Sequence, residues 1–328
     1  MLDTPDTHTL AAPLRHGHSS GWQGELAAID LGSNSFRLEL SRCSEGRYRR
    51  IDYLKETVRL GGCLGPDRHL RGTAVDHGLA CLARFADRLD GFPAERVRAV
   101  ATQTLREAAN REQFLRAAEQ ALGYPIEVIS GEEEARLIYK GVAQLQPGDQ
   151  PRLVVDIGGR STELILGRGA HAQAAASYGV GSVSVSRQFF PQGEFTAQAF
   201  AAAERQAAAA FAPGRLTFAR ALWQQALGSS GSASAVSNIL RSNGVSLDGV
   251  ITRAALDWCL HACLQAGRAD RLQLAGLEHD RAIVIGGGLA VLRALFATFG
   301  IETLNPAKGA LRHGLAFDLA ENLALTSA

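Results

Sequence analysis

Stretches with strand-like and helix-like patterns of apolar residues alternate along most of the chain. In the first half, the apolar segments 97–101 and 126–129 predict buried strands. The segments at about 73–90 and 104–122 predict helices, because each is followed by a glycine and a proline. A further helix is expected directly after Ser130. This alternation is typical of α/β proteins.

The second half of the chain continues the same alternation. An alanine-rich helix is expected at 197–211, capped by Thr196, and another at 253–266. The apolar segment 282–285 predicts a strand that runs into a triple-glycine turn at 286–288 and then a helix. A final helix is expected at about 309–325, packed on either half.

Two segments of the chain resemble one another at a fixed spacing. Residues 28–40 and 154–166 each contain an apolar strand, an aspartate, a glycine- and serine-rich turn and a second strand. The shared aspartate, glycine, serine and leucine positions all recur at an offset of 126 residues. Two similarly built α/β domains are therefore expected. We place the boundary between the two domains near the loop 146–151, which is rich in proline and glycine.

Composition excludes several classes of protein. The 328 residues are 46% hydrophobic and 20% charged, which is typical of a globular chain with a large core. The net charge of +1 gives no general attraction for nucleic acid, and interrupted apolar stretches predict no membrane span. Five cysteines without a C-x-x-C motif indicate reduced thiols in a cytoplasmic protein. Residues 1–24 are expected to be a mobile polar tail, not a signal peptide.

Four glycine- or serine-rich turns each follow an apolar segment, at 32–35, 158–161, 228–232 and 286–288. Glycine allows backbone N–H groups to approach a phosphate closely, and a following helix adds positive potential. Ordinary turn chemistry explains any one of them, but together they favour a phosphate-rich ligand. No GxxxxGK[ST] motif or dinucleotide fingerprint is present.

Three acidic residues in the repeated hairpins could contact Mg²⁺. Asp30 and Asp156 follow equivalent strands, and Glu163 lies across the second hairpin from Asp156. Mg²⁺ needs only one or two protein carboxylates, because it keeps several waters. Alternatively, the aspartates accept hydrogen bonds from their own turns.

Two further residues have both a structural and a functional interpretation. Ser130 and Glu133 fit a capping box, which would explain the glutamate without catalysis. Arg106 follows a strand and is either a helix-surface residue or a phosphate ligand.

Taken together, these segments resemble the exopolyphosphatase and guanosine pentaphosphate phosphohydrolase family of the actin-like ATPase superfamily. The resemblance runs in order over about residues 26–325, and its most specific part is the SGEEEARLI string at 130–138. Other matching segments are IDLGSNSFRL at 29–38, VRAVATQTLREAAN at 97–110, LVVDIGGRSTELILG at 153–167, LGSSGS at 227–232 and VIGGGLAVL at 284–292.

The resemblance implies a fold, a cleft and roles for particular residues. It implies two actin-like (ribonuclease H-like) α/β domains with mixed sheets, which we place at 25–146 and 147–328. It implies Glu133 as the base that activates water and Arg106 as a catalytic phosphate ligand. It implies Asp156 and Glu163 as acids of a Mg²⁺ site. The implied phosphate-binding residues are Gly32, Ser33, Asn34, Ser35, Gly158, Gly159, Arg160, Ser161, Gly228, Ser229, Ser230 and Gly231.

Two departures from the family pattern bear on function. Arg160 replaces the third glycine of the usual D-I-G-G-G-S loop, so either the turn is altered or φ is negative there. Its guanidinium could contact phosphate or block the loop. By length, the sequence resembles the short, two-domain form of the family, so the extra C-terminal domains of long family members are not expected.

The expected function is Mg²⁺-dependent removal of terminal phosphate from inorganic polyphosphate. Guanosine pentaphosphate is an equally suitable substrate by sequence, and an ATP-dependent kinase or ATPase is disfavoured by the SGEEEARLI string. A non-catalytic sensor of polyphosphate or alarmone, inactivated by Arg160, is the alternative from another class. Dimers are common in this family, so the resemblance also implies a possible homodimer, although no motif in the sequence specifies an interface.

Overall fold

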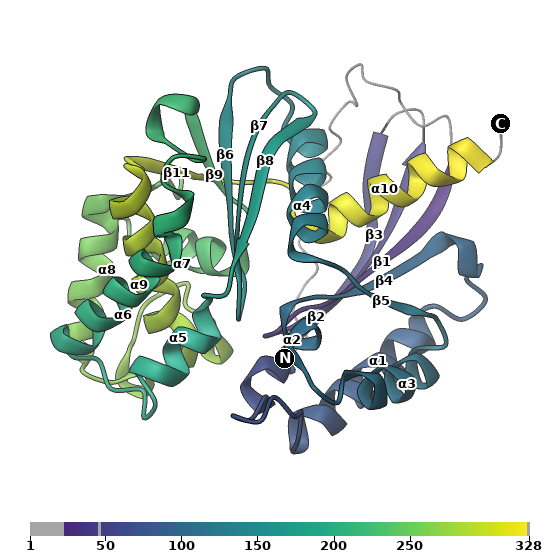
Figure 1. Cartoon of the computed structure of the whole chain (residues 1–328), viewed down its shortest axis with the longest axis horizontal. Coiled ribbons are helices and arrows are strands. Elements are labelled where there is room, and N and C mark those ends of the chain that lie inside the picture. The colour runs from purple at the N-terminus through teal and green to yellow at the C-terminus, as the bar shows by residue number, and fades with distance from the viewer. Residues whose placement is uncertain (1–22, 45–46, 327–328) are drawn as a thin grey trace.

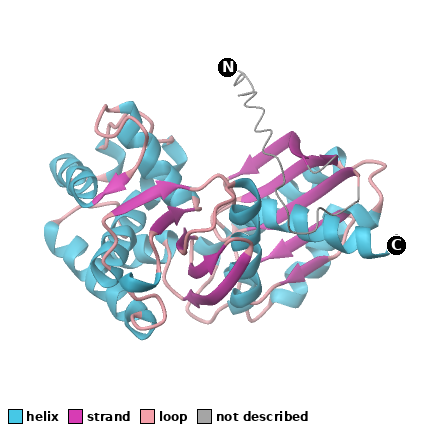
Figure 2. Cartoon of the chain, turned by 90° about the horizontal axis from the view of Figure 1, so that it is seen from above, coloured by secondary structure: helices cyan, strands magenta, loops and turns pink. Residues whose placement is uncertain are grey.

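The computed structural model describes residues 23–44 and 47–326, which form two α/β lobes (Figure 1). The expected polar tail at 1–24 therefore lies almost wholly outside the described residues, and the first strand begins at Gly24. The predicted α/β fold class with mixed sheets is confirmed, because each lobe is built on a sheet of parallel and antiparallel strands covered by helices. Figure 2 shows the two lobes from above.

The sheet of the first lobe has the strand order β3-β2-β1-β4-β5. The first three strands are antiparallel neighbours, whereas β4 is parallel to β1 and β5 is parallel to β4. The strands are β1 (Gly24–Leu31), β2 (Phe36–Ser44), β3 (Arg47–Glu56), β4 (Val97–Ala101) and β5 (Ile126–Val128).

The sheet of the second lobe repeats this arrangement and adds an edge strand. Its order is β8-β7-β6-β9-β11-β10, with β6 antiparallel to β7 and parallel to β9. Asp30 faces Arg37 across the first hairpin and Asp156 faces Glu163 across the second, so the 126-residue repeat is a structural repeat. The strands are β6 (Arg152–Ile157), β7 (Thr162–Arg168), β8 (His171–Tyr178), β9 (Gln225–Gly228), β10 (Ile251–Thr252) and β11 (Thr303–Pro306).

Helices cover both faces of the first sheet. One face packs on α1 (Thr73–Arg88) and α3 (Arg111–Leu122), with the short α2 (Gln103–Glu107) following β4. The predicted single helix at 104–122 is thus two helices, because the chain bends at 108–110. The other face packs on α4 (Gly131–Leu145) and α10 (Leu311–Thr326). The last helix therefore belongs to the first lobe, although we placed it in the domain at 147–328 (Figure 1).

The helices of the second lobe surround a central apolar helix. They are α5 (Ser182–Phe189), α6 (Ala197–Phe211), α7 (Gly231–Ser242), α8 (Arg253–Ala266) and α9 (Ala282–Phe299). Thr196 caps α6 as predicted, since its side chain accepts a hydrogen bond from the N–H of Ala199. Helix α9 lies in the core, with most of its length buried.

The prediction of a strand at 282–285 and a phosphate-binding turn at 286–288 is wrong. These residues form the first turns of α9, and all three glycines are buried. A Cβ at Gly287 would lie 2.3 Å from the carbonyl oxygen of Ser182. At Gly287, therefore, glycine allows the backbones of α5 and α9 to pack in close contact.

The segment His279–Phe299 is, among the described residues, the one helix long and apolar enough to cross a membrane. Arg293 interrupts this apolar stretch, as expected from the sequence. Its most apolar part is 72% buried within the second lobe, as in the core helix of a globular domain.

Candidate functional site

A cavity of about 360 Å³ lies where the two lobes meet. Three loops contribute to its wall: the first loop (32–35) and the second loop (158–161) at the tips of the two hairpins, and the third loop (228–231) before α7. Ten of the twelve expected phosphate-binding residues line it. They are Gly32, Ser33, Asn34, Ser35, Gly158, Gly159, Ser161, Ser229, Ser230 and Gly231.

The small residues of the loops allow the hairpin tips to meet. A Cβ on Gly159 would lie 2.9 Å from Cβ of Ser33 and 3.3 Å from the backbone nitrogen of Asn34. Any larger residue at 159 would therefore push the two loops apart. At the third loop, Ser230 caps α7, whose N-terminus faces the cavity and adds positive potential there. The result is a wall rich in backbone N–H groups, which suits phosphate oxygens.

Four carboxyl groups gather at this junction. Asp30, Glu134 and Asp156 line the cavity, and Glu163 lies fully buried behind them. Burial raises the pKa of Asp156 to about 6, with a further increase from the charge of Asp30. Burial and the charges of Glu134 and Asp156 raise the pKa of Glu163 well above its usual range. This junction concentrates negative charge, and a polyanionic ligand would add more.

Glu134 is the carboxyl group of α4 that faces the cavity. Its side chain is almost fully buried, and burial followed by the charges of Asp30 and Asp156 raises its pKa to about 7. Arg106 opposes that shift, since its Nη1 donates to Oε2 of Glu134 at 2.8 Å. The same Nη1 donates to the carbonyl oxygen of Ile129, and Gln103 accepts two further hydrogen bonds from Arg106. Arg106 therefore holds Glu134 in place and does not itself line the cavity.

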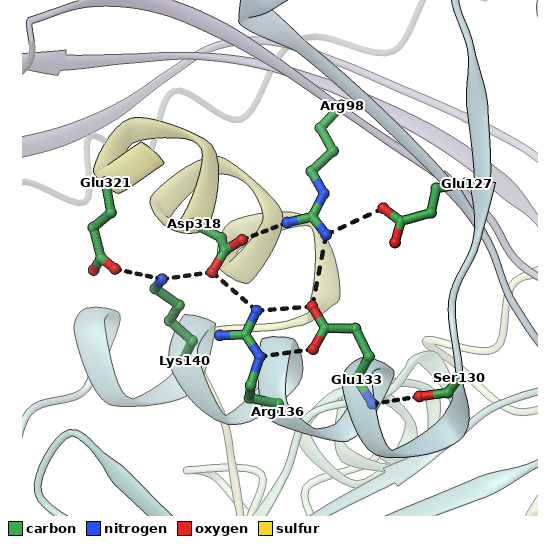
Figure 3. Close-up of polar contacts among 8 residues, drawn as sticks. All are labelled: Arg98, Glu127, Ser130, Glu133, Arg136, Lys140, Asp318 and Glu321. Carbon is green, nitrogen blue, oxygen red and sulfur yellow. Dashed lines mark hydrogen bonds and ion pairs between the residues drawn. The ribbon is translucent and has the colours of Figure 1, made fainter. Parts of the chain in front are cut away.

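Glu133, which we expected in the cleft, lies on a different side of α4 (Figure 3). Its carboxylate accepts two hydrogen bonds from Arg136, at 2.7 and 2.8 Å, and lies 3.6 Å from Arg98. Successive residues of a helix point about 100° apart, so Glu133 and Glu134 cannot both face the cavity. These contacts, led by the Arg136 hydrogen bonds, lower the pKa of Glu133. Of these two glutamates, only Glu134 lines the cavity.

Only half of the predicted capping box is present. The backbone N–H of Glu133 donates to Oγ of Ser130 at 3.1 Å, but the Glu133 side chain turns to Arg136. Figure 3 shows that this side chain belongs to a cluster that joins α4 to α10, centred on Asp318. Asp318 accepts from Arg98, Arg136 and Lys140. We call this group the Asp318 cluster.

Three other expected site residues lie away from the cavity wall. Gly228 is the residue before Ser229 and does not line the cavity. A Cβ on Gly228 would contact Ala233 and Leu304 inside the second lobe. Glu163 receives a hydrogen bond from Ser177 at 2.8 Å, while its Oε2 is buried without a partner. Arg160 donates to Glu107 and to the carbonyl oxygen of Gly61, both in the first lobe. Arg160 is not among the non-glycine residues with positive φ, so the turn accommodates it and its guanidinium does not block the second loop.

The cationic residues that do line the cavity were missed from the sequence. Arg281 and Arg37 lie near the loops, the former against Gly231 and the latter paired with Asp30 at 3.1 Å. Arg312 lies at the start of α10. The complete set is Arg37, Lys55, Arg281, Lys308 and Arg312. No short motif marks them, because they come from five separate elements and loops.

The donor set fits a Mg²⁺ ion held partly by substrate. No three histidine, cysteine or acidic side chains converge as a closed metal site among residues 23–44 and 47–326. Asp30 and Asp156 nonetheless present carboxylates to the cavity, and the unpartnered Oε2 of Glu163 lies in the same acidic group. Mg²⁺ usually takes one or two carboxylates, with waters and phosphates completing its shell.

Comparisons with known proteins agree with this geometry. A Haemophilus influenzae protein described as "Putative exopolyphosphatase" is 40% identical over 298 residues, covering 91% of this chain and 92% of that protein. The structure of a Cytophaga hutchinsonii exopolyphosphatase is similar in fold, with a TM-score of 0.81 and 21% identity over 91% of this chain and 98% of that one. An Aquifex aeolicus structure of the Ppx/GppA protein family has a TM-score of 0.70 and 24% identity, covering 94% of this chain and all of that one.

The sequence profile of the Ppx/GppA phosphatase family matches residues 41–323. That range includes the second and third loops, α4 with Glu134, and most of both lobes. The chain belongs to the Ppx/GppA phosphatase family.

Proposed function

We propose that this protein is an exopolyphosphatase that hydrolyses the terminal phosphoanhydride bond of inorganic polyphosphate and releases orthophosphate. The observation that carries the proposal is the position of Glu134. Its carboxyl group lines a cavity whose other walls are loops rich in backbone N–H groups. A base opposite a phosphate-binding wall is the arrangement that phosphoryl transfer to water needs.

The loops and cations would bind the terminal phosphoryl group. Transfer of this group spreads negative charge over its oxygens, so catalysis depends mainly on positioning and electrostatic stabilisation. Backbone N–H groups of the three loops and the guanidinium of Arg281 are available for that role. Arg281 suits it because its ion pair to Glu278 is long, at 3.6 Å, which leaves donors for phosphate.

Glu134 would orient the attacking water and accept its proton. A base is most effective when its pKa lies near the working pH, and that of Glu134 is raised to about 7. Arg106 would act as a positioning residue through its hydrogen bonds to Glu134 and to the carbonyl oxygen of Ile129. This gives Glu134 the role that the sequence suggested for Glu133. It makes Arg106 a positioning residue instead of the expected phosphate ligand.

Mg²⁺ forms part of the proposal, with Asp156 and Asp30 as its ligands. When bound, the ion would neutralise phosphate charge next to the carboxylates. Glu163 would support the site from behind, because its buried Oε2 has no hydrogen-bond partner within the described structure. A cytoplasmic location is also proposed, since all five cysteines are free and four are buried.

The decisive experiment compares Glu134→Gln with Glu133→Gln. Both changes remove one carboxylate from adjacent positions of the same helix. Phosphate release from polyphosphate with Mg²⁺ should fall about 100-fold or more in Glu134→Gln. It should stay within about threefold of wild type in Glu133→Gln, whose carboxylate contacts only the Asp318 cluster. Full activity of Glu134→Gln, or a large loss in Glu133→Gln, would refute the assignment.

Guanosine pentaphosphate is the second substrate to test, because its terminal phosphoanhydride could enter the same loops. The ratio of kcat/KM values for the two substrates separates these activities. The sensor alternative rested on Arg160 obstructing the second loop. Arg160 instead contacts Glu107 and Gly61, so the geometry favours turnover.

A further inference from the structure

A cationic strip leads out of the cavity along the edge of the first sheet. Strand β3 is the edge strand, and its Tyr53 and Lys55 line the cavity. Arg50 lies further from the cavity on the same strand. Arg312 belongs to α10, and its guanidinium group lies over the ring of Tyr53, as that of Arg50 does. We call Arg50, Tyr53, Lys55 and Arg312 the Tyr53 ledge.

The aromatic ring organises this ledge. The guanidinium carbons of Arg50 and Arg312 each lie 5.1 Å from the ring centroid of Tyr53, within the range of cation–π interactions. Arg312 lines the cavity, whereas the Arg50 side chain is 45% exposed. The ring therefore bridges a cation inside the cavity and a cation outside it.

A buried carboxylate fixes both guanidinium groups. Glu39 is 1% exposed, accepts from Nε of Arg312 at 2.6 Å and lies 3.3 Å from Nε of Arg50. The charges of Arg312 and Arg50 and a hydrogen bond from Tyr48 lower its pKa to about 2 against the opposing effect of burial. Two guanidinium groups share this carboxylate, and Lys55 pairs with Glu278 at 2.8 Å. The three cations of the ledge thus outnumber the two carboxylates, Glu39 and Glu278, that form ion pairs with them.

The dimensions of the ledge suit an extended anion. Strand residues advance about 3.3 Å each, so Arg50 and Lys55 are separated by roughly 15 Å along β3. A bulge between Leu40 and Ser41 of the neighbouring strand shifts the register, so that Arg50 and Tyr53 share a face. A linear polyphosphate carries charge along its whole length, whereas in guanosine pentaphosphate the nucleoside interrupts the phosphates and divides them into two shorter groups.

We propose that the Tyr53 ledge binds the phosphates that follow the terminal one, and so gives the protein a preference for long polyphosphate. This inference rests on the proposed exopolyphosphatase function. The terminal phosphate would lie among the three loops, and the following units would leave past Lys55 and Arg312 toward Arg50. Tripolyphosphate, with only three phosphates, would not reach Arg50.

The chain contains a matched control for Arg50. Arg49 is the adjacent residue of β3, is exposed and makes no ion pair with any described residue. Adjacent strand residues point to opposite faces of the sheet, so Arg49 has the same charge but lies off the ledge. Arg50→Gln and Arg49→Gln therefore change the net charge equally, and Arg50→Lys restores a cation on the ledge.

The experiment measures kcat/KM for long-chain polyphosphate, tripolyphosphate and guanosine pentaphosphate with Mg²⁺. Arg50→Gln should lower the value for the long chain about fivefold or more, with tripolyphosphate within about twofold. Arg49→Gln should leave both unchanged, and Arg50→Lys should recover most of the loss. Equal losses on long and short substrates, or a loss confined to guanosine pentaphosphate, would overturn the proposal.

A binding measurement separates failure of the ledge from failure of the proposed function. If wild-type protein releases no phosphate from any substrate, the proposed function is wrong. Titration of long-chain polyphosphate into wild type, Arg50→Gln and Arg49→Gln then still tests the ledge. Weaker binding in Arg50→Gln alone would support it, and equal binding by all three would refute it. Unchanged thermal unfolding of Arg50→Gln excludes a folding defect.

Discussion

Protonation of one buried histidine should make the protein less stable in mild acid. His313 of α10 is 2% exposed and lies in the packed interface between α10 and the first sheet. Its Nδ1 accepts a hydrogen bond from the N–H of Ala310 at 3.0 Å, and its Nε2 lies 3.4 Å from Glu39. A proton on Nδ1 would break the bond to Ala310. The fold therefore holds the neutral imidazole.

The size of the effect follows from the pKa. Burial, with a smaller contribution from Arg312, lowers the pKa of His313 from 6.5 to about 3, although Glu39 opposes the shift. Above pH 6.5 neither the folded nor the unfolded chain carries this proton. As the pH falls below 6.5, only the unfolded chain gains it, so the free energy of unfolding decreases by about 1.4 kcal/mol per pH unit. At pH 5 the loss from His313 should be about 2 kcal/mol.

The test compares wild type with His313→Asn in urea unfolding experiments from pH 7.5 to pH 5. Asparagine places an oxygen near the position of Nδ1, so it can still accept from Ala310, but it does not titrate. The variant should be less stable at pH 7.5, because it leaves part of the histidine volume empty. That stability difference should shrink by about 2 kcal/mol at pH 5. A constant difference across this pH range would refute the idea that His313 is neutral in the fold.

Three other variants test particular contacts. Arg160→Gly should keep phosphate release within about threefold of wild type. It should lower the free energy of unfolding by about 1–2 kcal/mol, because it removes the contact to Glu107, and a large change in rate would contradict this expectation. Asp318→Asn should lower the free energy of unfolding in urea by about 1–3 kcal/mol, because Arg98, Arg136 and Lys140 all lose their shared carboxylate. An unchanged free energy would show that the Asp318 cluster contributes little to stability. Gly287→Ala should cost about 2–3 kcal/mol or more by thermal unfolding, since its Cβ would meet the carbonyl oxygen of Ser182, whereas Gly148→Ala meets nothing within 4 Å and should be silent.

The repeated hairpins were predictable because their pattern is local. An apolar strand, an aspartate and a small-residue turn carry enough information within 13 residues to place both loops of the cavity. The boundaries of the helix at 253–266 and the strand at 97–101 also agree with the structure. Each has a distinct cap or a clear flanking turn.

The sequence of α4 also predicts which side chains share a face of the helix, once the helical period is applied to it. Glu133, Arg136 and Lys140 are spaced by three and four residues and form a charged stripe. Glu134 and Ile138 are four apart and both line the cavity. Identifying Glu134 as the glutamate that faces the cavity required this comparison in addition to the family motif.

The errors at α9 and α10 have a different cause. Helix α9 is apolar on all sides, so its sequence shows no period that separates a helix from a strand followed by a turn. The place of α10 depends on which lobe offers an apolar face, which is a property of the assembled sheet. The same holds for Arg281 and Arg312, which reach the cavity only through the tertiary arrangement.

The return of α10 to the first lobe has a consequence for biosynthesis. Leu311, Leu315 and Phe317 of this helix share one apolar cluster with Leu26 and Ala28 of β1. A ribosome must therefore finish nearly the whole polypeptide before the lobe that was translated first can close its interior. Until then, that lobe exposes an apolar sheet face, which makes the nascent chain a natural client for chaperones that shield such surfaces.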